Sequence, residues 1–543
     1  MAFCDRCGSQ LASDERFCSK CGVDRMAAGG GAPATTPPGA TPPGPPAQYP
    51  PQYPPAAGLV PFAAMPPAAG MQKQNKVWLV VAGAAVLFAL YHFVGPQPQQ
   101  PQQQRQSGPI NLIFVVSEDL AYQSPGDVNP YTANLTSQGL ERSLLTGTYL
   151  HQLAGTSSVN GIYALTPMTH LQTAGNFPDM VAAETVEQFA ALTQVTMSTA
   201  YPGYGSPLTI GGYPINASPP SDSCANCQGL DFADQGGDNE ALVNGILAAN
   251  ISGSYVFSAP WETTSSLLAR INQLKSYNLA LPASYQGANA IYVISIAPSG
   301  SASLTTYNSN ANPSATYPAL RQVPTGACTE QPPFNLAVTG GVGGAQIPAG
   351  INTNETLYII RHAEAHPQGS FDDGNYVGAG QWRALALPSV LGGRIHPTQV
   401  YAIDPGTPIT GTQSASGVST WSYVRPALTV EPYAIAYNLP FRLAEGFDWS
   451  SAPASSSYFF GGGGFSNASV LVGWEHGAIP EMVTALISSY FPQGGAPATP
   501  AWPADDYDSV WTVTLDGQGN LAVNNSVCEG IPSAALPATA PQF

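Results

Sequence analysis

The chain has 543 residues, with 16 lysines and arginines against 33 aspartates and glutamates and a net charge of −17. This length exceeds one ordinary core, so several domains are expected. The acidic balance repels phosphate backbones and excludes nucleic-acid binding as a general function. Beyond residue 109 only nine basic residues occur, so an arginine within a motif there is informative.

Residues 1–26 contain two CxxC pairs. Four thiolates at this spacing can close a tetrahedral zinc site. The segment resembles the short zinc-ribbon modules found at the N-terminus of many bacterial membrane proteins, and the sequence gives no partner for it. The alternative is two disulfides, which a reducing cytosol disfavours. The predicted ligands of this structural zinc are Cys4, Cys7, Cys18 and Cys21.

Residues 27–72 are rich in Pro, Ala and Gly and are predicted to be a disordered linker. Residues 73–96 contain an uncharged run that is about 28 Å long as a helix, enough to cross a bilayer. A signal peptide is the alternative, but 76 residues precede the run and no clear cleavage site follows it. Lys73 and Lys76 come just before the run. The positive-inside rule then predicts a single-pass protein of the bacterial inner (plasma) membrane, with a cytoplasmic N-terminus and extracytoplasmic C-terminal domains.

Four further cysteines would then lie in an oxidising compartment, where pairing is favoured. We expect a disulfide between Cys328 and Cys528, which would tie the C-terminal tail to the start of the second domain described below. The CxxC formed by Cys224 and Cys227 is interpreted as a structural disulfide. A redox pair and half of a metal site are its alternatives.

Beyond a Gln/Pro spacer at 97–108, runs of β type alternate with helical stretches over 109–325 and 345–543. Strands that alternate with helices are typical of parallel sheets covered on both faces. The sequence therefore predicts two α/β domains, each with three layers and a mostly parallel sheet.

The segment "LYIIRHAEAHP" is an apolar strand that ends at Arg361 and His362. Open α/β sheets place ligand sites outside the carboxyl ends of their strands. Three blocks follow in order: "GQWRALAL", "VRPALTVEPYA" with Arg425, and "VLVGWEHG" with His476. Together the four blocks resemble the histidine phosphatase superfamily, which includes phosphoglycerate mutases and acid phosphatases, over residues 356–515.

The resemblance implies a phosphomonoester phosphatase that acts on a phosphorylated small molecule without a catalytic metal or cofactor. His362 would be the nucleophile and would form a phosphohistidine. Arg361, Arg425 and His476 would hold the phosphoryl oxygens. These residue types also suit a dianionic group independently, because phosphoryl transfer depends on positioning and charge stabilisation. The alternative is that the arginines are unrelated surface residues.

The proton donor to the leaving group is less clear from the sequence. One branch of the family uses a glutamate after the second arginine, for which Glu445 is the nearest candidate. Another uses an aspartate just after the second histidine, where this chain has Gly477; Glu475 precedes that histidine instead. A surface or helix-capping role is the alternative for both glutamates.

Residues 109–325 resemble a degenerate copy of the same domain. Val116 and Ser117, followed by Glu118, stand where the arginine and histidine would fall, and "NLTSQGLERSLLTGTYL" matches the family's first helix. We expect His170 near the second-arginine position, and the second-histidine position at the end of "AIYVISIA", at Ile296 or Ala297. An unrelated α/β domain is the alternative.

The sequence as a whole predicts a membrane-anchored phosphatase whose second extracytoplasmic domain is active. The rival hypothesis is a binding or scaffold protein in which phosphatase-like folds only recognise ligands or partners. The missing basic residues of the first domain favour the rival, whereas the intact "RHAE" block opposes it.

Overall fold

The computed structural model describes residues 108–155, 157–172, 175–193, 229–234, 237–328, 331–365, 374–406 and 422–543, and the backbone alone of 2–3, 10–11, 215–216, 408–413 and 417–421. The chain divides into two compact units, Met1–Gln104 and Arg105–Phe543. In the first unit only the antiparallel pair Ala2–Phe3 (β1) and Gln10–Leu11 (β2) is described. The predicted linker and membrane span, and the N-terminal cysteines with Cys224 and Cys227, lie outside the described residues. No helix among the described residues is long and apolar enough to span a bilayer.

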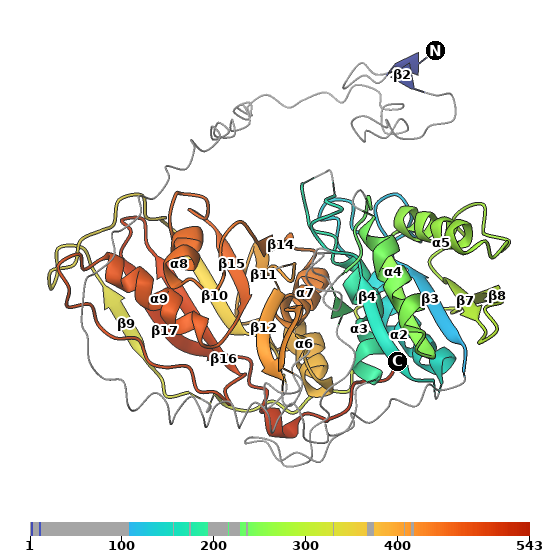
Figure 1. The fold of residues 1–543 in the computed structure, drawn as a ribbon. Helices are drawn as coiled ribbons and strands as arrows, with labels where there is room; N and C mark the ends of the chain where they lie inside the picture. Colours follow the sequence, from blue (N-terminus) through green and yellow to red (C-terminus); the bar gives the residue numbers. More distant parts are fainter. Residues whose placement is uncertain are drawn as a thin grey trace, which may run out of the picture. The chain divides into compact units, whose positions relative to one another are not determined.

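The second unit contains a seven-stranded sheet in the order β14-β11-β15-β10-β16-β17-β9 (Figure 1). It also contains a separate antiparallel pair, β12 (Pro408–Gln413) and β13 (Gly417–Ser422). The strands of the large sheet, in its spatial order, are Phe441–Ala444 (β14), Gln399–Ile403 (β11), Ser469–Trp474 (β15), Glu355–Arg361 (β10), Ser509–Leu515 (β16), Leu521–Cys528 (β17) and Asn335–Val338 (β9).

A six-stranded sheet precedes it in the chain, in the order β5-β4-β6-β3-β7-β8. Its strands, again in spatial order, are Ile215–Asn216 (β5), Val159–Ala164 (β4), Gly253–Ala259 (β6), Ile110–Val116 (β3), Ala290–Ile296 (β7) and Ala302–Asn308 (β8). In the small sheet β3 lies between the parallel β6 and the antiparallel β7, and in the large sheet β10 lies between the parallel β15 and the antiparallel β16. The six strands of the small sheet therefore correspond one to one, in order and direction, to six of the large sheet.

The two sheets are mixed rather than mostly parallel. In the large sheet β14, β11, β15 and β10 are parallel, and β16, β17 and β9 are antiparallel to their neighbours. Connections of a few residues, 516–520 and 297–301, join β16 to β17 and β7 to β8, and such short connections can only link antiparallel strands. The prediction of parallel pairing holds for the half of each sheet whose strands are joined through helices.

Helices cover both faces of the large sheet. Side chains alternate along β10, so Ile360 packs into the core beneath α7, whereas Leu357 and Ile359 pack into the core beneath α9. The predicted three layers are thus present in this domain. The helices are Ser137–Ala154 (α2), Val181–Leu192 (α3), Asp238–Ala249 (α4), Trp261–Lys275 (α5), Gly378–Leu391 (α6), Arg425–Tyr437 (α7), Ala452–Phe460 (α8) and Ala478–Ser489 (α9), with a 3₁₀ turn at Ser533–Ala535 (η2).

The helices α2 and α6 each approach a loop, the one after β3 or the one after β10, so closely that the helix needs a glycine there. A Cβ on Gly139 of α2 would lie 2.2 Å from the carbonyl oxygen of Asp127, and one on Gly380 of α6 would lie 2.7 Å from that of Glu364. Real Cβ atoms do not come so close to backbone, so only glycine fits there. In α6 this contact sets the helix against the residues that follow His362.

The second domain begins earlier than the sequence predicted. Residues 335–338 form β9, which pairs with β17 at the sheet edge, so the boundary at 345 is wrong. The strand has only four residues and begins at Asn335, a residue type that is depleted in strands, which weakens its sequence signal.

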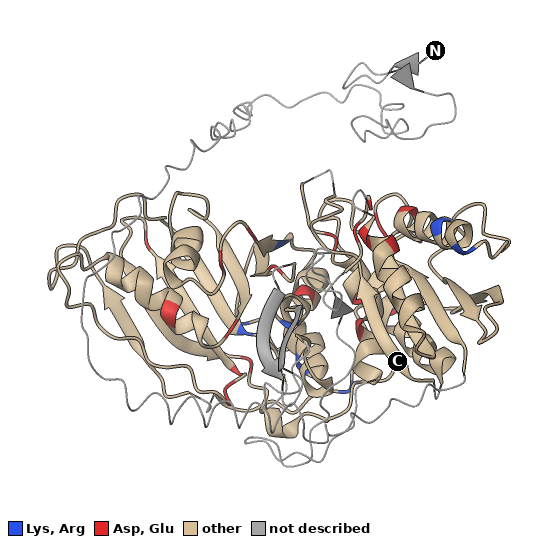
Figure 2. Cartoon of the chain, viewed as in Figure 1, with Lys and Arg blue, Asp and Glu red and all other residues tan. Residues whose placement is uncertain are grey.

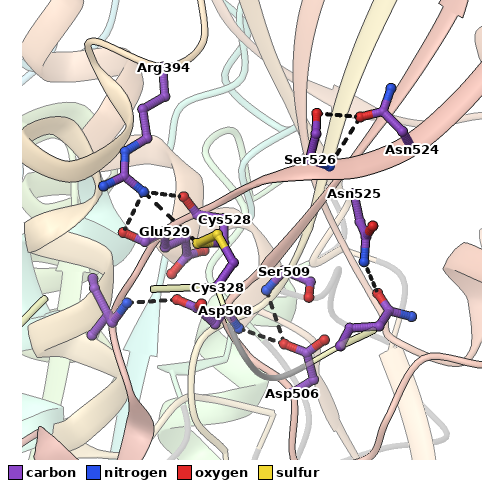
Figure 3. The surroundings of a disulfide bond; sticks show 12 residues. Cys328, Arg394, Asp506, Asp508, Ser509, Asn524, Asn525, Ser526, Cys528 and Glu529 are labelled. Atoms are coloured by element: carbon purple, nitrogen blue, oxygen red, sulfur yellow. Dashed lines mark hydrogen bonds between the residues drawn. A yellow bond between two sulfur atoms is a disulfide. The ribbon is translucent and has the colours of Figure 1, made fainter. Parts of the chain in front are cut away.

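The predicted disulfide between Cys328 and Cys528 is present (Figure 3). It joins the segment before β9 to the end of β17. Arg394 donates from Nη1 to the carbonyl oxygen of Cys528 at 2.7 Å, and the next residue, Glu529, turns its side chain into the interior. The disulfide therefore fixes the end of β17. The C-terminal segment, which contacts residues of the site described below, continues from that point.

The two α/β domains meet through α2 and α3 of the first and α6 and α7 of the second. Glu187 accepts a hydrogen bond from Asn375 at 2.9 Å, and Gln381 donates to Gln188 at 2.8 Å. Buried residues of both domains belong to one continuous apolar core. The domains are consequently not separate bodies joined by a linker.

Two carboxyl groups, Glu184 of α3 and Glu431 of α7, are buried together at this interface. Burial raises the pKa of Glu184 to about 7. Burial and the charge of Glu184 also raise the pKa of Glu431 well above its usual range, although the nearby Asn134 side chain acts in the opposite direction. The pair is therefore stable at the interface only when it retains a proton.

Replacing both Cys328 and Cys528 by serine should lower the free energy of unfolding by about 5 kcal/mol in the chain-entropy model, because the bond closes a loop with a sequence separation of 200. Urea denaturation of the full chain measures this loss. An unchanged midpoint in the serine variant would remove the stabilising role.

Stability should fall as the pH rises from about 4.5 through 7. The folded pKa of Glu184 is about 7 and lies above the usual value of 4.5, so the folded state binds more protons in this window. We expect a higher melting temperature at pH 5 than at pH 8, and a smaller difference in Glu184→Gln. Glu481→Gln, at an exposed position, is the control; an equal change in both variants would contradict the assignment.

Candidate active site

Four of the predicted site residues come from adjacent ends of the large sheet and from one helix. His362 follows β10, His476 follows β15, and these strands are parallel neighbours with Arg361 opposite Trp474. Arg425 is the first residue of α7, which packs on the same sheet. The charges of Arg361, Arg425 and His476 all act on His362, so the structure brings the four side chains together.

His362 is held as a neutral imidazole with one defined tautomer. Its Nδ1 lies 2.8 Å from the carbonyl oxygen of Ala363, and because a carbonyl only accepts, Nδ1 carries the proton. Burial, followed by the charges of Arg425 and Arg361, lowers the pKa of His362 well below its usual value. The Nε2 atom therefore carries an available lone pair at neutral pH.

Arg361 is fixed by backbone carbonyls of the C-terminal region. Its Nη1 donates to the carbonyl oxygens of Ala504 at 2.7 Å and Asp506 at 3.1 Å, and its guanidinium stacks on Tyr507 at 3.8 Å. Its Nε–H is buried with no acceptor among the described residues. A donor in that state suits an oxygen of an anionic ligand, since a buried N–H without a partner is costly.

Arg425 is fixed by the segment before α6. Its backbone N–H donates to Gly374 at 3.1 Å, and its Nη1 donates to the carbonyl oxygen of Asn375 at 3.3 Å. The guanidinium also lies 4.7 Å from the ring of Tyr423. The exposed fractions of His362, Arg361 and Arg425 are 3%, 5% and 6%, so the imidazole and the two guanidinium charges lie in a largely dehydrated environment.

Glu475 caps a helix and pairs with His476. Its carboxylate accepts from the backbone N–H groups of Gly477 at 2.7 Å and Ala478 at 2.8 Å, at the start of α9, and forms an ion pair with His476. Burial raises its pKa, but the hydrogen bond and charge of His476 and the two N–H groups outweigh burial and bring it to about 2. This geometry favours the helix-capping alternative over proton donation.

Glu445 follows β14 at the same edge of the sheet and is exposed. Sequence reasoning missed its neighbour Asp404, which follows β11. Burial, together with the charge of Glu445, raises the pKa of Asp404 to about 6, despite a backbone hydrogen bond from Gly406. The signal was available, because "QVYAIDP" is a strand that ends in a carboxylate.

A fully buried ion cluster supports the loop after His362. Arg383 of α6 donates to Glu364 at 2.6 and 2.8 Å and pairs with Glu529, the neighbour of Cys528. Arg383 also donates to the carbonyl oxygen of Ile531 at 2.7 Å. The chain has few basic residues (Figure 2), and Arg361, Arg383 and Arg425 are all buried in this one domain.

The first domain lacks basic groups at the equivalent positions. Because β3, β6 and α3 correspond to β10, β15 and α7, Val116 and Ser117 replace Arg361 and His362. The N–H of Ser117 donates to Ala259 at 3.0 Å, as that of His362 donates to Trp474 at 2.9 Å. Val181 and Trp261 occupy the positions equivalent to Arg425 and His476.

Two of the expected equivalences were therefore wrong. The strand that contains Ile296 is antiparallel to β3, so its end lies at the opposite edge of the sheet, and "SYVFSAPW" is the true counterpart of the second-histidine block. His170 precedes α3 and lies 3.5 Å from Asp119, but it is not the counterpart of Arg425. The missed signal is a repeat, "TVEQFA" at 185–190 and "TVEPYA" at 429–434.

The repeat is structural as well. Thr185 donates from its hydroxyl to the carbonyl oxygen of Val181 at 2.7 Å, and Thr429 donates to that of Arg425 at 2.6 Å. Thr429 Oγ1 also accepts from the N–H of Ala363 at 2.9 Å, which links α7 to the residue after His362. The same local sequence thus builds the same helix start in both domains.

No protein-family model matches the sequence, and no curated protein matches it. Among solved structures, one assigned as phosphohistidine phosphatase SixA from Nakamurella multipartitia is 16% identical, covers 36% of this chain and 96% of its own, and has a TM-score of 0.19. A mycobacterial hydrolase is 12% identical, covers 33% of this chain and 91% of its own, and has a TM-score of 0.20. At these similarities the strand order and the site, rather than the neighbours, support a function.

Proposed function

We propose that the second domain is a phosphomonoester phosphatase that acts through a phosphohistidine at His362. The observation that carries the proposal is a buried, neutral histidine with Nδ1 committed to a carbonyl, held between two buried arginines. Such a site attracts a dianion and presents a nucleophile to it. The phosphatase-like fold of both domains is part of the same proposal.

The reaction has two balanced steps. Nε2 of His362 attacks phosphorus, and the bond to the leaving oxygen breaks as that oxygen gains a proton. Water then attacks the phosphohistidine, releases inorganic phosphate and restores the imidazole. Arg361, Arg425 and His476 neutralise charge on the phosphoryl oxygens in both steps.

The proton donor is assigned to the pair Asp404 and Glu445. A carboxyl group whose pKa is about 6 can hold its proton near neutral pH and still release it to a leaving oxygen. The ionised Glu475 instead orients His476. Of the two glutamates predicted from sequence, Glu445 is retained through its effect on Asp404.

The first domain is proposed to be a degenerate copy without phosphatase activity, because Val116, Ser117, Val181 and Trp261 supply no charge for a phosphoryl group. The zinc ribbon of Cys4, Cys7, Cys18 and Cys21, the single membrane span at 73–96 and an extracytoplasmic location are further proposals that rest on the sequence. The next experiment distinguishes an active phosphatase from the alternative, a binding or scaffold protein.

Replacing His362 by Ala should abolish turnover of an aryl phosphate by the full chain, by several orders of magnitude, since no neighbouring group can take over in-line attack. Acid-quenched mass spectrometry of the wild type should find phosphate on His362. Ser117→Ala, at the equivalent position of the first domain, is the matched control and should keep full activity. Phosphate on another residue, or an active His362→Ala protein, would overturn the assignment.

Activity should fall as the pH rises through about 6, because Asp404 must be protonated to act as an acid. Asp404→Asn should lower turnover of an alkyl phosphate about a hundredfold and remove this pH limb. Turnover of an aryl phosphate with an acidic phenol should change little, since its leaving group needs no proton. Equal losses on both substrates would refute the acid role.

A further inference from the structure

We propose that the first domain positions the catalytic arginine of the second, through Glu187. This inference rests on the proposed phosphatase function and adds a role for the domain that lacks basic site residues. Glu187 lies on α3, outside the second domain, and touches neither His362 nor its arginines in any described contact.

The connection runs through one short segment. Arg425 is bound to residues 374 and 375 at two points, by its own N–H to Gly374 and by Nη1 to the carbonyl of Asn375. The side chain of Asn375 donates to Glu187 at 2.9 Å, and Tyr376 also hydrogen-bonds Glu187. The acceptor for the arginine is therefore part of a segment that the other domain holds by two consecutive side chains.

Burial makes this connection rigid. Asn375 and Glu187 are almost completely inaccessible, at 1% and 2% exposure, so water cannot replace their hydrogen bond. Asn375 Oδ1 also accepts from the N–H of Tyr376 at 2.8 Å, which fixes the amide relative to its own backbone. Loss of Glu187 would remove this buried hydrogen bond and allow the Asn375 carbonyl to turn away from Arg425.

The pseudo-symmetric contact provides an internal control. Asn134 precedes α2 as Asn375 precedes α6, and its Oδ1 accepts from the N–H of Leu135 at 2.8 Å. Its side chain acts on Glu431, the counterpart of Glu187 in the TVE repeat. On this side the residue equivalent to Arg425 is Val181, the first residue of α3, and its side chain carries no charge. The equivalent asparagine therefore lies next to the equivalent glutamate on the side without an arginine, whereas on the other side the hydrogen bond from Asn375 to Glu187 leads on to Arg425.

The experiment uses the full chain and compares Glu187→Ala, Asn375→Ala, their double variant and Asn134→Ala. The readouts are kcat/KM for an aryl phosphate, orthovanadate affinity by calorimetry and melting temperature. We expect Glu187→Ala and Asn375→Ala each to lower kcat/KM and vanadate affinity about tenfold, as for one lost hydrogen bond to a charged group. The double variant should lose no more than either single one, because both break one connection.

Asn134→Ala should keep wild-type kcat/KM and vanadate affinity. Glu187→Gln should restore activity, because its amide oxygen can still accept from Asn375. If Glu187→Ala lowers kcat/KM and vanadate affinity no more than Asn134→Ala does, the inference is overturned. If Glu187→Ala does not fold, Asn375→Ala against Asn134→Ala decides the question.

The calorimetry separates this inference from the proposed function. A wild-type chain that binds vanadate but turns over no phosphate would refute the phosphatase, whereas a Glu187-dependent affinity would still support arginine positioning. If the wild type is active but Glu187→Ala has the same kcat/KM and vanadate affinity as the wild type, the positioning role alone is refuted. A wild type with neither activity nor affinity would refute both.

Discussion

Two guanidinium groups buried beside one imidazole form the constraint on which the rest of the second domain depends. Burying a charge is costly unless hydrogen bonds compensate it, and backbone carbonyls accept hydrogen bonds from both Arg361 and Arg425. A carbonyl acceptor fixes the geometry of a guanidinium and adds no negative charge to the site. Burial, together with these positive charges, lowers the pKa of His362 and keeps it neutral, as the proposed nucleophile requires.

Carbonyls hold an arginine only if their own segments are fixed, and those segments come from far along the chain. The acceptors of Arg361 belong to residues 504 and 506, in a region that Asp508 joins to Ile531 and that the disulfide ties down at Cys528. The acceptor of Arg425 belongs to the segment before α6, which packs against the first domain. Arg383 connects the two regions, because it binds Glu364 on one side and Glu529 on the other. The loop of His362 is thus stabilised from both ends of the domain.

The sequence predicted the four residues that the structure brings together around His362, and it missed those whose proposed role depends on the backbone. Arg361, His362, Arg425 and His476 are rare residues in an acidic chain, at the ends of strong strand or helix patterns. Asn375 carries no such signal, because its role depends on a carbonyl that every residue has and on a neighbour 188 positions away. Asp404 was missed because the acid was sought at the positions that the resemblance supplied. The strand of Ile296 was assigned to the wrong edge because an apolar run does not specify its direction in a mixed sheet.

The proposed duplication gives a reason for retaining a domain without basic site residues. If two identical copies met through equivalent helices, each copy would position the other's arginine. The glutamate of its TVE repeat, Glu187 or Glu431, would act through the asparagine of the other copy, Asn375 or Asn134. Replacement of the arginine by Val181 removes the need for that support on one side only. Under the proposed positioning role, a first domain that has lost its charges would still require Glu187, whereas Asn134 and Glu431 would keep only a packing role. The buried Glu184, which replaces Leu428 of the second repeat, lies on the same helix and gives this interface a preference for mildly acidic conditions, the range in which Asp404 also holds its proton.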